Sequence, residues 1–83
     1  MKENLQYNVI FKAEPEGGFT ATVPALPGCV SFGKDLTEAK AMIADAIEGY
    51  IASLQKHGEP VPSDAESFMA TVSFPVLPNF RHA

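Results

Sequence analysis

Apolar side chains occupy every second position in two consecutive stretches near the start of the chain, residues 5–14 and residues 19–23. A period of two is typical of a strand that buries one face. Between the stretches, Gly17 and Gly18 can adopt positive φ and favour a turn, and Pro24 ends the second strand because it cannot donate a ladder hydrogen bond. The pattern therefore predicts a β-hairpin. Its core-facing residues would be Leu5, Tyr7, Val9, Phe11, Ala13, Phe19, Ala21 and Val23.

A third short strand and a helix are expected next. The strand would cover residues 29–33, after a stiff Leu-Pro-Gly corner in which Leu26 fills the core. Asp35 is a good helix N-cap, Glu38 can complete a capping box, and Gly58 suits the position after the last helical turn. Apolar residues at helical spacing predict one buried stripe, made of Leu36, Ala39, Ile43, Ala46, Ile47, Tyr50 and Leu54.

Residues 68–74, FMATVSF, alternate again and predict a fourth strand. The element order is then βββαβ, an α+β fold in which three sequential strands form an antiparallel meander and one helix covers one sheet face. A right-handed crossover would place the last strand parallel to the first or the third. The 83 residues are enough for one domain. We expect this domain over residues 1–78, with a short tail over 79–83.

One motif occurs twice: VPALPG (23–28) and FPVLPN (74–79) share Pro-x-Leu-Pro before a turn residue. Each copy can end a strand and bury one leucine. Alternatively, the second copy belongs to an extended arm that docks on a neighbouring subunit. The helix-free sheet face, where Ile10 is apolar, and the open sheet edges also favour self-association. We therefore expect a homodimer or a larger homo-oligomer.

Charge is unevenly distributed along the chain. The net charge is −4, and residues 35–66 carry seven acidic residues against two lysines. An acidic chain repels phosphate backbones, which disfavours direct nucleic-acid binding, and it attracts a basic partner. The sequence has no apolar run long enough to span a membrane and no signal peptide, and its single cysteine excludes an internal disulfide. These features indicate a protein of the reducing cytoplasm.

Few residues are suited to catalytic or metal chemistry. Cys29 would need a base to act as a nucleophile, and the two histidines, His57 and His82, follow much later in the sequence. A small thiol between a glycine and a valine is more typical of a core position. One cysteine and two distant histidines do not supply a metal site, and the Gly-Gly pair precedes a strand rather than a phosphate-binding helix. We expect no catalytic residue, no metal and no cofactor.

The segment EGGFTATVPALPGCVSFGKDLTEAKAMIADAIEGYI, residues 16–51, resembles the HicB antitoxin family. Glycine-glycine-aromatic leads through a strand into Val-Pro-x-Leu-Pro-Gly-Cys, and a capped helix beginning Leu-x-Glu-Ala follows. The first and fourth predicted strands match in character, so the resemblance covers about residues 5–78. It implies a partial ribonuclease-H-like fold, assembly into dimers or larger oligomers, and neutralisation of HicA, a small basic toxin that cleaves messenger RNA.

Two activities of related folds are not expected of this chain. Many members of the family carry a C-terminal DNA-binding segment, but this sequence ends nine residues after Phe74, so direct DNA binding is doubtful. Ribonuclease-H catalysis needs several carboxylates around two metal ions. The predicted first and fourth strands have no acidic residue in their interiors, and Asp45 and Glu48 lie on the helix away from its apolar stripe. We therefore reject a nuclease.

Asp45 and Glu48 are instead candidate contacts to a basic toxin. They share the polar helix face with Ala41 and Ala52, whose small side chains allow a partner to approach closely. An ordinary solvated helix face is the alternative explanation. A second candidate contact consists of Glu14 and Glu16 at the hairpin tip.

Two functions remain open from the sequence. The first is an antitoxin that covers the active site of a HicA-like toxin and opposes its basic surface with carboxylates. The alternative is a stand-alone oligomeric scaffold or regulatory module without a toxin partner.

Overall fold

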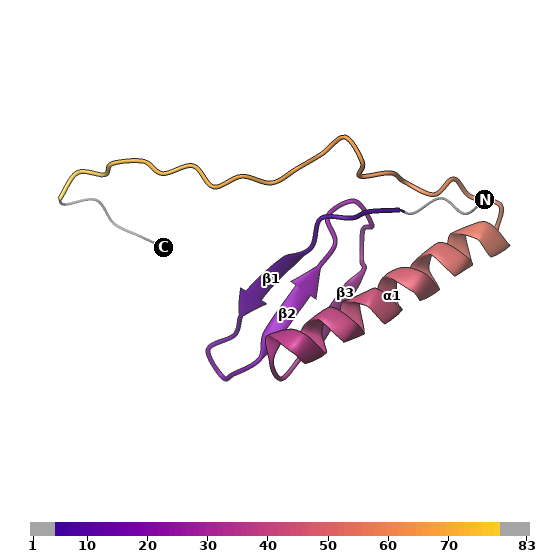
Figure 1. Ribbon diagram of the computed structural model, residues 1–83, viewed down its shortest axis with the longest axis horizontal. Helices are drawn as coiled ribbons and strands as arrows, with labels where there is room; N and C mark the ends of the chain where they lie inside the picture. The colour runs from indigo at the N-terminus through magenta and orange to yellow at the C-terminus, as the bar shows by residue number, and fades with distance from the viewer. Residues whose placement is uncertain (1–4, 79–83) are drawn as a thin grey trace.

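The computed structural model describes residues 5–78, so the tail predicted over 79–83 lies outside the described range. Three strands form an antiparallel sheet in the order β1-β2-β3, and one helix packs against one face of it (Figure 1). The elements are β1 (Ile10–Ala13), β2 (Phe19–Thr22), β3 (Val30–Gly33) and α1 (Leu36–Lys56). The predicted α+β class and the meander followed by a helix are confirmed.

The turn between β1 and β2 forms where the glycine pair predicts it. Gly17 and Gly18 have φ of 104° and 82°, values that glycine adopts readily and other residues rarely do. The Gly17 N–H donates to the Glu14 carbonyl oxygen at 3.0 Å, and the Glu14 N–H donates to the Gly18 carbonyl oxygen at 3.0 Å. These bonds close the hairpin and fix the register in which Ala13 faces Phe19.

Helix α1 begins at its predicted cap. The Asp35 side chain accepts a hydrogen bond from the Glu38 N–H at 2.8 Å, which satisfies one backbone donor of the first turn. The Glu38 carboxylate turns back and accepts from the Lys34 N–H at 3.0 Å. A standard capping box would use the N–H of Asp35 itself, so the reciprocal bond here lies one residue earlier.

The predicted end of the helix is also confirmed. Gly58 has a φ of 67°, and its N–H donates to the Gln55 carbonyl oxygen at 3.1 Å. The Glu59 N–H donates to the Leu54 carbonyl oxygen at 2.9 Å. Together these two bonds form a Schellman motif, which satisfies carbonyl groups of the last turn.

The corner between β2 and β3 is part of the core. Leu26 and Val23 are its largest fully buried side chains, and they pack with Ala21, Cys29 and Ile43. The Cys29 N–H donates to the Leu26 carbonyl oxygen at 2.9 Å, and the Val23 N–H donates to the Cys29 carbonyl oxygen at 3.1 Å. These contacts confirm that Leu26 fills the core.

One glycine sets the approach of the helix to the sheet. Gly33, the last residue of β3, is buried, and a Cβ built on it would collide with the backbone of Ala39 in the first turns of α1. Any side chain at position 33 would therefore push the start of the helix away from β3.

The fourth strand predicted over residues 68–74 is wrong for the single chain. Residues 59–78 form no strand: the chain passes the residues before β1 and then, over residues 68–78, extends beyond the sheet (Figure 1). Phe68, Val72 and Phe74 remain 85%, 70% and 78% exposed. The alternating pattern is that of a strand, but a strand forms only where an edge accepts its backbone hydrogen bonds. In this chain the segment does not reach one, so the predicted crossover is not completed.

Candidate partner-binding surface

The exposed face of α1 carries four of the six predicted contact residues. Ala41, Asp45, Glu48 and Ala52 follow one another at helical spacings of four, three and four residues, so they form one stripe. All four are exposed, whereas Ala39 and Ile43 on the opposite side are buried against the sheet. The structure thus brings two carboxylates together on an accessible surface with a small side chain beyond each end of the pair. We call this stripe the acidic stripe.

The hairpin tip presents its two glutamates differently. Glu16 is exposed at the turn, but Glu14 is partly buried, and its Oε1 accepts a hydrogen bond from the Thr20 hydroxyl at 3.0 Å. Glu14 therefore serves the hairpin itself. Figure 1 shows this turn at the same end of the molecule as the start of α1, away from the centre of the acidic stripe.

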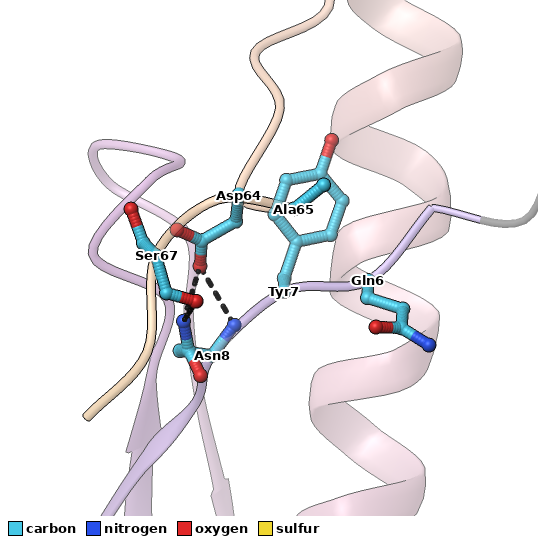
Figure 2. A pocket seen from close by; sticks show the side chains of 6 residues that line it. All are labelled: Gln6, Tyr7, Asn8, Asp64, Ala65 and Ser67. Carbon is cyan, nitrogen blue, oxygen red and sulfur yellow. Dashed lines mark hydrogen bonds between the residues drawn. The ribbon is translucent and has the colours of Figure 1, made fainter. Parts of the chain in front are cut away.

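A second polar cluster ties the chain after the helix to the residues before β1 (Figure 2). Asp64 Oδ2 accepts from the Asn8 N–H at 2.8 Å and from Asn8 Nδ2 at 3.0 Å, and Nδ2 also donates to the Ser67 carbonyl oxygen at 3.1 Å. The Tyr7 hydroxyl donates to the Pro62 carbonyl oxygen at 2.6 Å. We call these five residues the clasp, and residues 68–78 beyond it the arm.

The clasp borders a hollow of about 390 Å³, lined by Gln6, Tyr7, Asn8, Asp64, Ala65 and Ser67. In Figure 2 the Asp64 carboxylate points to Asn8. The polar groups of the clasp therefore serve to join the two segments. Sequence reasoning missed the clasp. Its partners are more than fifty residues apart, and an Asn and an Asp in two loops give no signal that they meet.

The clasp changes the pH at which the Tyr7 hydroxyl loses its proton. Burial, and secondly the Asp64 carboxylate, raise the pKa of the Tyr7 hydroxyl above its ordinary value of 10.0. A proton held more tightly in the folded chain contributes stability below pH 10, and this contribution is lost as the pH rises through the folded pKa. The Tyr7–Pro62 bond should therefore break only in strong alkali.

Absorbance titration of the phenolate tests this expectation. The chain has two tyrosines, so Tyr50→Phe isolates the signal of Tyr7. We expect Tyr7 to titrate above pH 10, and we expect Asp64→Asn to lower its pKa by removing the negative neighbour. A Tyr7 that titrates like a free tyrosine, with or without Asp64, would contradict the clasp.

Cys29 lies in the core, 4% exposed. Burial raises the pKa of its thiol, which disfavours the thiolate needed for nucleophilic attack. His57 is at the C-terminal end of α1, where its Nδ1 lies 2.8 Å from the Ser53 carbonyl oxygen. The Cys29 side chain packs with Val23, Leu26 and Ile43, which supports its interpretation as a core residue.

We expect Cys29 to react with an aromatic disulfide reagent about 100-fold more slowly in the folded chain than in denaturant, because reaction requires local opening. The rate of thiol release measures this directly. Equal rates in the two conditions would mean that the thiol is accessible.

Within residues 5–78, no three His, Cys, Asp or Glu side chains gather where they could hold a metal ion. Over the same range, no helix is both long and apolar enough to cross a membrane.

Comparison with known proteins places this sequence in a family. A sequence model described as the HicB-like antitoxin of bacterial toxin–antitoxin systems matches residues 7–78. The chain belongs to the HicB-like antitoxin family. The matched range includes the acidic stripe, the clasp and the whole of the arm.

Curated relatives of this HicB-like chain agree with the assignment. A UPF0150 protein of Thermoplasma acidophilum is 45% identical over 60 residues, which cover 72% of this chain and 87% of the relative. A UPF0150 protein of Synechocystis is 41% identical over 63 residues, which cover 76% of this chain and 80% of the relative. A second Synechocystis UPF0150 protein is 30% identical over 59 residues, 71% of this chain and 81% of the relative. The expected resemblance to HicB antitoxins is thus confirmed.

Proposed function

We propose that this chain is the antitoxin of a toxin–antitoxin pair and neutralises a small, basic, HicA-like toxin that cleaves messenger RNA. The observation that carries the proposal is the family match across residues 7–78. Its mechanism would be to cover the toxin's RNA-binding surface and to oppose the positive charges there with carboxylates. It would act in the cytoplasm as a single domain over residues 1–78.

The acidic stripe is the surface we propose for this contact. Asp45 and Glu48 are exposed in the middle of α1, where a partner can reach them. An RNA-binding protein surface is rich in lysine and arginine, and opposite charges on two surfaces speed their encounter. Ala41 and Ala52 would let the partner approach the helix backbone closely. Glu16 is a secondary contact at the hairpin tip.

The chain would act by binding and not as an enzyme. The hydrogen bonds of the clasp use its carboxylate and amide groups, and Cys29 is withdrawn into the core. We further propose that the chain is a homodimer, because the β1 edge of the sheet is open and the sheet face beside it, opposite α1, carries Ile10, Val30 and Phe32, each about half exposed. Such a face favours self-association.

A growth-rescue test examines the proposed function. The short basic reading frame beside this chain is expressed from an inducible promoter, with and without this chain. We expect growth to stop in the first case and to recover in the second. A harmless neighbour, or a toxic one that this chain does not neutralise, would contradict the antitoxin and favour the oligomeric scaffold.

A further inference from the structure

The arm has the alternating sequence of a β-strand but pairs with no strand in the structure. Apolar residues occupy every second position at Phe68, Ala70, Val72, Phe74 and Val76, and Met69 and Leu77 lie between these positions; every residue of the arm is exposed. Phe68, Val72 and Phe74 are each at least 70% exposed. The extended chain makes the molecule 54 Å long but only 29 and 22 Å across. Exposure of its six large apolar side chains to water is unfavourable, since each gains about 1.5–3 kcal/mol when buried. They are Phe68, Met69, Val72, Phe74, Val76 and Leu77.

The sheet offers a place for such a strand along β1. β1 is an edge strand, so its outer backbone groups are free to pair with another strand. Helix α1 packs against β2 and β3, and at the β1 side Tyr7, Val9 and Phe11 are only partly buried although they contact the core. The core is thus least covered next to the open edge.

The clasp directs the arm beyond its own sheet. Its last hydrogen bond is at the Ser67 carbonyl oxygen, and from Phe68 onward the chain diverges from β1 (Figure 1). The arm therefore projects its apolar residues to where a second copy can meet them. Its reach extends well past the body of the fold.

Charge argues for a second copy as the occupant. Residues 68–78, FMATVSFPVLP, contain no charged side chain, so the arm has no carboxylate with which to oppose the positive charge of a basic toxin. It matches an edge of the same apolar character, and the edge beside Val9 and Phe11 is present on every copy of this chain. A twofold exchange uses two identical contacts and closes the assembly.

We propose that residues 68–74 of one copy form the fourth strand along β1 of a second copy, in a reciprocal exchange that makes the homodimer. Phe68, Val72 and Phe74 would then cover the partly buried Val9 and Phe11 of the other chain. Pro75 cannot donate a ladder hydrogen bond and ends the pairing. The exchange rests on the homodimer proposed above, and it supplies the strand that completes the βββαβ order.

Sedimentation of the full chain and of two matched variants tests the exchange. We expect a dimer for the wild type and for Thr71→Asp/Ser73→Asp, whose charges lie on the other face of the arm. Val72→Asp/Phe74→Asp should weaken dimerisation by about 100-fold or more, since charges resist burial in an apolar contact. Helical circular dichroism should persist because the arm does not contact the core. A wild-type monomer, or a Val72→Asp/Phe74→Asp dimer as stable as the wild type, would overturn the exchange.

Disulfide trapping separates exchange from pairing within one chain. In a Cys29→Ser background, one tagged chain carries Thr71→Cys and a second carries Lys12→Cys at β1. We expect the mixture to form a covalent heterodimer, and the double variant on one chain to form mainly dimers at low concentration. A closed monomer would show that the arm pairs with its own β1. If a monomeric chain still rescued growth, the exchange would be contradicted and the antitoxin proposal would be retained.

Discussion

Replacing Leu26 by alanine is expected to lower the free energy of unfolding by about 3 kcal/mol, within the range of 2–5 kcal/mol for buried leucines. Leu26 is 0% exposed and lies at the centre of the corner that joins β2 to β3. The substitution leaves a cavity beside Val23 and Ile43. A chain of this size has a total stability of about 4–12 kcal/mol, so the loss is a large fraction. Urea denaturation followed by circular dichroism measures it.

Leu36→Ala is the matched control because Leu36 is the same residue type and, contrary to its predicted place in the buried stripe, is 41% exposed at the start of α1. It should cost less than about 1 kcal/mol, since less apolar surface is lost and alanine favours a helix. Both variants are measured at one chain concentration, because a dimer's stability depends on it. Equal losses for the two leucines would contradict the description of the corner as the core.

Reversing the charge of the acidic stripe with Asp45→Lys/Glu48→Lys is expected to weaken binding of the basic toxin by about 10- to 100-fold, mainly through slower association. Both side chains are exposed on α1, so the folded chain should keep its stability. Surface plasmon resonance at two salt concentrations measures the rates. The wild-type association rate should fall with salt, and the variant's should not.

Glu59→Lys/Glu66→Lys makes the same change in net charge at two exposed residues outside the helix. This control should alter binding much less, because the proposed contact depends on where the carboxylates lie. A similar loss in both variants would mean that only the overall charge of the chain matters. An unchanged association rate in Asp45→Lys/Glu48→Lys would remove the stripe from the contact.

Local signals in the sequence predicted the body of the fold. The glycine pair at 17–18, the cap at Asp35 and Gly58 each act over a few residues, and each forms the turn or helix end expected of it. The buried positions of Leu26 and Cys29 were also predictable from the sequence, Leu26 as the apolar residue of a stiff corner and Cys29 as a small thiol between a glycine and a valine. The acidic stripe was predictable because helical spacing alone determines which residues share a face.

Features that depend on long-range contacts were not predictable in the same way. The alternation in residues 68–74 predicts a strand, but the segment forms none in the structure, because alternation does not say whether an edge is there to pair with it. Periodicity reports the two faces of a strand and carries no information about its neighbour. The clasp escaped prediction for a related reason, since Asn8 and Asp64 meet only after the helix returns the chain to β1.

Messenger RNA cleavage by the purified neighbouring toxin, titrated with this chain, tests the central claim most directly. The account predicts that the toxin cleaves RNA alone, and that cleavage falls to background when about one chain is present per toxin, as for tight binding at concentrations above Kd. Asp45→Lys/Glu48→Lys should need a clear excess to reach the same inhibition. Cleavage that continues in the presence of excess folded wild-type chain would contradict the account.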